Sequence, residues 1–368
     1  MNGNNGYFMQ QALDLAKKGW PNVAPNPMVG CLIVKNDEVV ASGYHEQFGG
    51  PHAEVNAVNN LPEAINPADC TLYVTLEPCS HFGKTPPCAD LIISKGFKTI
   101  VIACNDPNPK VSGNGVKKML EAGIDVTVGV LEKEAKELNK RFITFFENKR
   151  PYFILKWAQT ADGFISRTPQ PRDPAGEAGT GKQDRISGPE ANKIVHELRA
   201  EVMGIMVGKN TVLNDNSLLT TRLVEGKNPA RIFIDKNLEV PLTYNIYNTD
   251  AETIVFNAIK SEHSGRIRFV KINFDENVLQ QVSEKLFGLN IQNVLVEGGK
   301  FLLDDFINQH LWDEVLVFQN PQLVFDQGIK APAFALKNSF ELAGNDKFYH
   351  HFKNETLPAK GLLAKEIF

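Results

Sequence analysis

The chain has 368 residues and a net charge of −4, with 42% hydrophobic and 22% charged residues. The length suggests two domains, because single hydrophobic cores stop growing at about 250–300 residues. The lack of a basic excess argues against a nucleic-acid partner. The chain has no apolar run of the roughly 18 residues that a membrane span requires, and its start does not resemble a signal peptide. We therefore expect a cytoplasmic protein with no membrane partner.

Helix and strand patterns alternate through the first part of the chain, which indicates an α/β domain over residues 1–148. The turn Asn36-Asp37 between two apolar runs predicts a β-hairpin. The predicted strands cover 28–35, 38–43, 71–75, 99–103 and 126–130. The predicted helices cover 8–18, 52–60, 88–95, 113–122 and 132–148.

A break at Lys149-Arg150-Pro151 separates a second α/β domain, which we place at 151–368. The stretch 166–183 is rich in Pro, Gly and charge and predicts a mobile loop. Beyond residue 330 there is no usable motif, and this region could add a strand to the sheet or form an interface. The predicted strands cover 152–159, 204–207, 231–235, 253–256, 267–272, 293–297 and 314–319. The predicted helices cover 189–200, 278–287 and 300–309.

The five cysteines all lie in the first third of the chain. An odd number in a chain of this length argues against a disulfide framework. Cys31, Cys70 and Cys104 lie in or beside predicted strands, which favours core positions. Cys79 and Cys88 each follow a proline, and Cys88 begins a predicted helix, whose N-terminus favours the thiolate form that binds metals.

His52, Cys79 and Cys88 supply one imidazole and two thiolates, a ligand set for tetrahedral zinc with water in the fourth position. Glu54 would take a proton from that water and deliver it to a leaving amine. Taken singly, these residues could be buried structural cysteines, a surface histidine and a solvated glutamate. A closed structural zinc would need a fourth ligand, for which Cys104, Cys70 and His81 are the candidates. The His-Ala-Glu pattern favours the open catalytic site.

The pattern is similar to that of zinc deaminases of nucleobases, H-x-E followed by P-C-x-x-C, but eight residues separate the two cysteines here. The stretch Glu77-Pro-Cys-Ser-His-Phe-Gly-Lys-Thr-Pro-Pro-Cys88 closely resembles the deaminase half of the bifunctional riboflavin-biosynthesis deaminase–reductase family. The resemblance covers residues 6 to about 148. Further matching stretches are 24–30, 43–45, 50–54, 105–109 and 113–115.

This resemblance implies a cytidine-deaminase-like α/β/α fold, one Zn²⁺ per chain and a small-molecule substrate. The substrate would be a diaminopyrimidinone with a phosphoribosylamino group, whose 2-amino group is replaced by oxygen. Asn and Asp suit a pyrimidine edge, and Lys84 with the imidazole of His45 or His81 suits the phosphate. The simpler alternatives are turn formation by the asparagines and a solvated Lys84. The residues that match the family's substrate positions are Asn26, His45, Lys84, Asp106 and Asn108.

The second half resembles the family's reductase domain, which has a dihydrofolate-reductase-like α/β fold and uses NADPH to reduce the ribose to a ribityl group. Gly298-Gly299 lies between a predicted strand and helix, where backbone N–H groups suit a phosphate; a plain tight turn is the alternative. The G-x-G-x-x-G fingerprint is absent. Arg185 occupies a position where many members have Trp. The matching stretches are 155–163, 184–187, 196–200, 208–215, 218–222 and 296–299.

By position, the resemblance implies two sets of reductase residues. Arg199 and Arg222 suit a ribose phosphate, although a surface salt bridge is the commoner role of a single arginine. Lys156 or Glu297 would assist proton transfer. The dinucleotide set is Ala158, Thr211, Asp215, Gly299, Lys300, Phe301, Leu302, Leu303, Asp304 and Asp305. The substrate set is Lys156, Gln183, Arg199, Leu219, Arg222 and Glu297.

The sequence therefore predicts an enzyme of riboflavin biosynthesis with two sites, which we also expect to be a homo-oligomer. Two other classes of function compete with this prediction. The first is a nucleoside or RNA deaminase with a C-terminal recognition domain, which the negative net charge disfavours. The second is a binding protein that keeps zinc for folding, which the presence of Glu54 disfavours.

Overall fold

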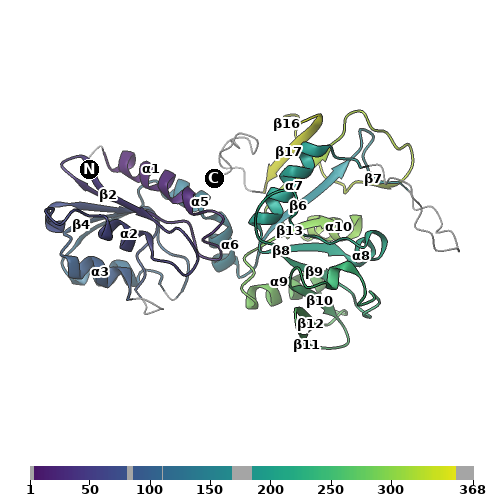
Figure 1. Ribbon diagram of the computed structural model, residues 1–368, viewed down its shortest axis with the longest axis horizontal. Helices are drawn as coiled ribbons and strands as arrows, with labels where there is room; N and C mark the ends of the chain where they lie inside the picture. Colours follow the sequence, from purple (N-terminus) through teal and green to yellow (C-terminus); the bar gives the residue numbers. More distant parts are fainter. Residues whose placement is uncertain (1–3, 81–85, 110, 168–184, 354–368) are drawn as a thin grey trace. The chain divides into compact units, whose positions relative to one another are not determined.

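The computed structural model describes residues 4–80, 86–109, 111–167 and 185–353. The chain forms two compact units, one ending at Arg150 and one beginning at Pro151. Each unit is a β-sheet with helices on both faces (Figure 1), so the predicted α/β class is confirmed in both halves. In the described ranges, none of the helices has the length and apolar character needed to cross a membrane.

The first unit is built on a five-stranded sheet in the order β2-β1-β3-β4-β5. β1 is antiparallel to β2 and β3, whereas β3, β4 and β5 are parallel. α1, α5 and α6 pack on one face, and α2, α3 and α4 pack on the other. The strands are β1 (Gly30–Lys35), β2 (Glu38–Tyr44), β3 (Thr71–Val74), β4 (Thr99–Ile102) and β5 (Asp125–Val128). The helices are α1 (Asn5–Ala16), α2 (Ala53–Asn59), α3 (Cys88–Lys95), α4 (Asn114–Glu121), α5 (Glu132–Leu138) and α6 (Lys140–Asn148).

Two local predictions in this unit had different outcomes. The hairpin turn is confirmed, since Asn36 and Asp37 both have positive φ, as a tight hairpin requires. The single helix over 132–148 is wrong, because it is divided at Asn139 into α5 and α6. The Asn139 amide bonds both the N–H and the carbonyl of Met28, at 2.8 Å each. This buried tertiary pairing overrides the local helical pattern.

The second unit is built on a ten-stranded sheet in the order β11-β12-β10-β9-β8-β13-β6-β14-β17-β16. The strands from β12 to β14 are parallel, and β11, β17 and β16 are antiparallel to their neighbours. α9 and α10 pack on one face, and α7 and α8 pack on the other. The parallel strands are β6 (Tyr152–Gln159), β8 (Gly204–Gly208), β9 (Ala230–Ile234), β10 (Thr253–Asn257), β12 (Ile267–Lys271), β13 (Asn293–Gly298) and β14 (Glu314–Gln319). The others are β11 (Glu262–Ser264), β16 (Glu341–Ala343) and β17 (Asp346–Phe352). The helices are α7 (Pro189–Glu201), α8 (Lys209–Asp215), α9 (Val278–Gly288) and α10 (Lys300–Asn308).

The region after residue 330 contributes to this sheet. β17 pairs antiparallel with β14, so the strand alternative is correct. A separate two-stranded sheet joins β7 (Phe164–Ser166) to β15 (Ile329–Lys330). The predicted mobile loop begins in β7, and its residues 168–183 lie outside the described part of the chain. Helix α8 was not predicted from the sequence.

Candidate active sites

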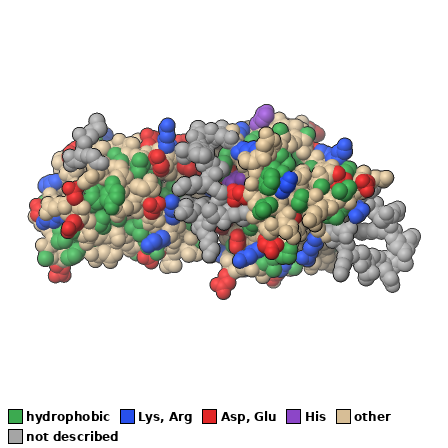
Figure 2. Space-filling view, turned by 90° about the horizontal axis from the view of Figure 1, so that it is seen from above, with side chains coloured by type: hydrophobic (Ala, Val, Ile, Leu, Met, Phe, Trp, Pro, Cys, Tyr) green, Lys and Arg blue, Asp and Glu red, His purple; other side chains and the backbone are tan. Residues whose placement is uncertain are grey.

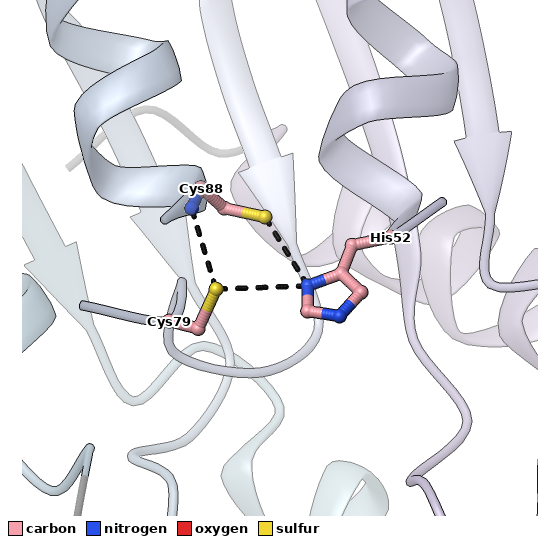
Figure 3. Close-up of side chains that lie close together, drawn as sticks. All are labelled: His52, Cys79 and Cys88. Atoms are coloured by element: carbon pink, nitrogen blue, oxygen red, sulfur yellow. Dashed lines mark hydrogen bonds between the residues drawn. The ribbon is translucent and has the colours of Figure 1, made fainter. Parts of the chain in front are cut away.

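Three potential metal ligands converge in the first unit. His52 immediately precedes α2, Cys79 follows β3 and Cys88 is the first residue of α3. The His52 Nδ1 lies 3.6 Å from the Cys79 Sγ and 3.3 Å from the Cys88 Sγ. Figure 3 shows the three side chains lying close together. The three ligand atoms all lie within 4.8 Å of one another. One imidazole and two thiols pointing at a common centre fit zinc, with a tetrahedral position left open.

The two thiols of this group differ in protonation. Hydrogen bonds from Cys88, followed by one from His52, outweigh burial and lower the pKa of Cys79 to about 4. The Cys88 N–H contributes to this by donating to the Cys79 Sγ at 3.3 Å. The hydrogen bond between the two cysteines, together with burial, raises the pKa of Cys88. A thiolate, the form that binds metals, is therefore already favoured at Cys79.

Glu54 lies in the first turn of α2, two residues after His52, and is only 3% exposed. Burial raises its pKa, although the neighbouring His52 opposes this effect. A carboxyl group whose pKa is moved toward neutrality is suited to accepting and returning protons. Glu54 thus has a raised pKa at the position where the sequence predicts a base for proton transfer.

The other cysteines do not join this group. Cys70 donates to the Asn66 carbonyl and Cys104 donates to the Thr75 carbonyl. Cys31, Cys70 and Cys104 are all buried, so their predicted core positions are confirmed. Neither Cys70 nor Cys104 supplies a fourth ligand, and His81 lies outside the described residues. The open ligand set is therefore favoured over the closed structural one.

Asn26 and His45 form a hydrogen-bonded pair near the metal ligands. The His45 Nδ1 lies 2.9 Å from the Pro51 carbonyl, and its Nε2 lies 3.0 Å from the Asn26 Nδ2. Because a carbonyl can only accept, Nδ1 carries the hydrogen and Nε2 accepts from the amide. Burial also lowers the pKa of His45. The lowered pKa favours the neutral ring, whose two nitrogens face Pro51 and Asn26, so His45 supports the Asn26 side chain. A phosphate contact of His45 or His81 stays a prediction.

Asp106 and Asn108 lie in the loop that follows β4. The Asp106 Oδ1 accepts from the Asn108 N–H at 2.8 Å. Burial is the main reason that the pKa of Asp106 is raised to about 6. Lys84, the remaining predicted substrate residue of this unit, lies outside the described residues.

In the second unit, Arg199 from α7 meets Glu297 from β13. The Arg199 Nε donates to the Glu297 Oε1 at 2.8 Å, and Nη2 donates to Oε2 at 2.7 Å. Lys156 of β6 acts electrostatically on both groups. Burial would raise the pKa of Glu297, but the charges of Arg199 and Lys156 outweigh it and lower that pKa. Burial lowers the pKa of Lys156.

Arg222 is positioned next to this cluster by two contacts. Its backbone N–H donates to the His196 Nδ1 at 3.0 Å, and its side-chain Nη1 donates to the Thr220 Oγ1 at 2.9 Å. Burial, followed by the charges of Arg199 and Arg222, lowers the pKa of His196 to about 4. Leu219 precedes this contact with a φ of +51°, an unusual conformation for a non-glycine residue. Gln183 lies outside the described residues.

Except for Ala158, which lies in β6, the predicted dinucleotide residues follow the carboxyl ends of the neighbouring parallel strands β8 and β13. Gly299 has a φ of +83°, and a side chain there would contact Thr211 and the backbone of Gly208. In the first turn of α10, Leu302 and Leu303 have their side chains in the core. Of this segment, only backbone N–H groups and outward side chains can therefore contact a ligand. Lys300 forms an ion pair with Asp304, whereas Phe301 and Asp305 are exposed. Asp215 is the last residue of α8, and Ala158 is half-buried in β6.

Three residues with supporting roles were not predicted as site residues: Glu77, Asn139 and His196. His196 had a usable signal, because it lies three positions before Arg199 and therefore on the same face of a helix. Asn139 had none, since its partner Met28 is 111 residues away. Glu77 could be seen as part of the motif before Cys79, but the sequence did not indicate its partners.

Comparisons with known proteins bear on both units. A family model of the cytidine and deoxycytidylate deaminase zinc-binding region matches residues 3–104, and one of the RibD C-terminal domain matches residues 151–330. The riboflavin biosynthesis protein RibD of Aquifex aeolicus is 42% identical over 90% of this chain and 92% of its own length. The chain belongs to the RibD family. Its Escherichia coli relative is 34% identical over 86% of this chain and 88% of its own length.

Solved structures of the family agree with this assignment. A deaminase/reductase from Thermotoga maritima matches with a TM-score of 0.79 and 36% identity, over 94% of this chain and 97% of its own. RibD of Acinetobacter baumannii matches with a TM-score of 0.81 and 30% identity, over 95% and 98%.

Family membership establishes the general function. The chain is an enzyme of riboflavin biosynthesis that combines a zinc-binding deaminase domain with a reductase domain. This decides against the RNA deaminase and the non-enzymatic binding protein. Figure 2 shows Lys and Arg side chains interspersed with Asp and Glu among the described residues of the face that it displays.

Proposed function

We propose that the first unit hydrolyses 2,5-diamino-6-(5-phosphoribosylamino)pyrimidin-4(3H)-one to 5-amino-6-(5-phosphoribosylamino)uracil and ammonia. The observation that carries this proposal is the convergence of His52, Cys79 and Cys88 beside the buried Glu54. Zinc held by these three ligands would supply an activated water. Glu54 then takes up the proton of the attacking water and delivers it to the leaving amine. Its raised pKa supports both steps.

Asn26, Asp106 and Asn108 would read the donor and acceptor edge of the pyrimidine. The amide of Asn26 is held by His45, so its orientation is fixed before the substrate binds. Asp106 has a pKa of about 6, so a substantial fraction is protonated in mildly acidic solution and can donate as well as accept. Lys84 is assigned to the phosphate by its position in the family motif alone.

We propose that the second unit reduces the ribosyl group to a ribityl group with NADPH. Hydride transfer is the chemistry of the nicotinamide, and the protein positions and polarises the substrate. Of the two candidate proton donors, Lys156 is favoured, because Glu297 is held as a carboxylate by Arg199. Arg222 would bind the substrate phosphate, with Leu219 and Gln183 beside it. The dinucleotide would lie across Ala158, Thr211, Asp215 and the first turns of α10.

A coupled assay tests both steps. Purified enzyme is given the diaminopyrimidinone and NADPH, and ammonia release and NADPH oxidation are followed separately. We expect Glu54→Gln to lower deamination about 10²- to 10⁴-fold, the usual range for loss of a general base. Zinc content and reduction of separately supplied deaminated substrate should remain at the wild-type level. Glu63→Gln, the same change at an exposed site, is the control.

Unchanged deamination by Glu54→Gln would refute the role of this residue. Failure of the wild-type protein to oxidise NADPH in the presence of the deaminated substrate would refute the proposed reductase reaction.

A further inference from the structure

Glu77 is a buried carboxylate that the proposed chemistry does not use. It lies two residues before Cys79 and is 3% exposed. Its two oxygens accept four backbone N–H groups. Oε2 accepts from Asp106 at 3.2 Å and from Gly113 at 3.0 Å. Oε1 accepts from Gly115 at 3.0 Å and from Val116 at 3.3 Å.

Two of these donors belong to the first turn of α4. The N–H groups of a first helical turn have no partner within the helix, and the helix dipole favours a negative charge beside them. The carboxylate of Glu77 therefore caps α4 from a distant part of the chain. Burying a charged group without partners is costly, so the four donors explain why the carboxylate is tolerated here.

The glycines of the segment 113–115 make this contact possible. Gly113 has a φ of +75°, a backbone conformation that side chains disfavour. A Cβ on Gly115 would overlap the carbonyl oxygen of Pro78, the residue between Glu77 and Cys79. The start of α4 is thus packed directly against the chain segment that carries the metal ligand.

The Asp106 N–H connects Glu77 to the proposed substrate loop. Its Oε2 holds the N–H of Asp106, and the side chain of Asp106 in turn holds the N–H of Asn108. The N–H of Glu77 donates to the Cys104 carbonyl at 3.0 Å, directly before that loop. One carboxylate therefore holds both ends of the loop 106–113 against the segment leading to Cys79.

We propose that Glu77 is a positioning residue of the deaminase unit, which fixes the loop carrying Asp106 and Asn108 relative to the metal ligand Cys79. This inference rests on the proposed deaminase function. The substrate loop would then be held in place by a residue that is neither a metal ligand nor a contact of the pyrimidine.

The test is Glu77→Gln in the full-length enzyme. The carboxamide keeps one acceptor oxygen but turns an NH₂ group toward two backbone N–H groups. We expect kcat/KM for deamination to fall about a hundredfold, which is the effect of displacing a binding group by about 1 Å. The change should lie mainly in KM, with zinc still bound at one per chain. Hydrogen exchange at the amides of Asp106, Gly113, Gly115 and Val116 should become faster.

Two controls separate positioning from folding. Glu121→Gln removes an exposed carboxylate from the same helix and should leave all readouts unchanged. Reduction of deaminated substrate by the second unit reports on the integrity of each preparation. Gly113→Ala disturbs the hydrogen bond between Gly113 and Glu77 through the backbone and should also raise KM. Asn tolerates this backbone conformation better than Ala, so Gly113→Asn should raise KM less.

An unchanged KM in Glu77→Gln and Gly113→Ala, with kcat reduced only in proportion to the folded fraction, would show that Glu77 merely stabilises the fold. Loss of zinc from Glu77→Gln would also overturn the proposal. These outcomes differ from failure of the proposed function itself, in which the wild-type enzyme would not deaminate the pyrimidine.

Discussion

Arg199 and Glu297 form a two-pronged ion pair between α7 and β13, in which the two side chains are only 11% and 8% exposed. A surface salt bridge is the commoner role of a single arginine. The burial of Arg199 and its contact with a residue of the proposed substrate site set it apart from the exposed ion pairs of the same unit.

The first prediction concerns this pair. Arg199→Ala should lower the free energy of unfolding of the second unit by about 3–5 kcal/mol, because it leaves a buried carboxylate without its main partner. Arg268→Ala removes a pair of similar chemistry whose side chains are 32% and 42% exposed, and should cost less than about 1 kcal/mol. Urea unfolding followed by the fluorescence of Trp157 and Trp312, both in the second unit, measures both. Equal costs for the two variants would contradict the prediction.

The second prediction concerns Asn139, which joins the break between α5 and α6 to the backbone of Met28. Asn139→Ala leaves a buried N–H and a buried carbonyl without partners, and should cost about 2 kcal/mol or more. Asn60→Ala removes an exposed bond to the Ser42 carbonyl and should change stability by less than about 0.5 kcal/mol. Denaturant unfolding, followed by a spectroscopic signal from the first unit, compares the free energies of unfolding of the two variants. The idea fails if Asn139→Ala is as stable as the wild-type protein.

The third prediction is a pH dependence caused by His196. Its pKa is about 4 in the folded protein and about 6.5 in the unfolded chain, so the unfolded chain binds more protons between these values. The stabilisation is therefore fully present above pH 6.5 and is lost as the pH falls toward 4. In His196→Asn, the amide oxygen can still accept the Arg222 N–H, but the side chain does not titrate.

The measurement is the free energy of unfolding of the second unit between pH 7 and pH 4. The difference between wild-type and His196→Asn isolates this histidine from the carboxylates that titrate nearby. We expect a shallower decline in the variant, and parallel curves for the two proteins would rule out the assignment.

The local elements of this fold could largely be predicted from the sequence. The apolar pattern and the proline before β6 define that strand as it is observed, and Gly96 ends α3 in the left-handed conformation. The break at Asn139 could not be predicted, because the two helices look continuous and the residue that divides them pairs with Met28. Helix α8 was missed because it is short and directly follows β8, so its apolar residues could be read as part of a loop.

The sites divide in the same way. His52, Cys79 and Cys88 could be predicted because metal binding demands particular residue types, and the structure brings them together. The neutral state of His45 could not be predicted, because it depends on the Pro51 carbonyl and the Asn26 amide at the two ring nitrogens. A motif indicates which side chains gather at a site, whereas their protonation depends on partners contributed by the fold.

The strand orders of the two sheets have a consequence for how the chain folds as it is synthesised. In the first unit, β1 needs only β2 and β3, which follow within a short stretch of chain. In the second unit, β6 is synthesised first but lies between β13 and β14 in the sheet. Tyr152 therefore cannot pair until Asn293 has been synthesised, and Ile154 cannot pair until Glu314 has. Distant pairings of this kind are slow to form, and unpaired strands are prone to aggregate. The strands of the deaminase unit can therefore pair early in synthesis while the reductase unit still exposes its central strand, which makes the second unit the one more exposed to aggregation as it folds.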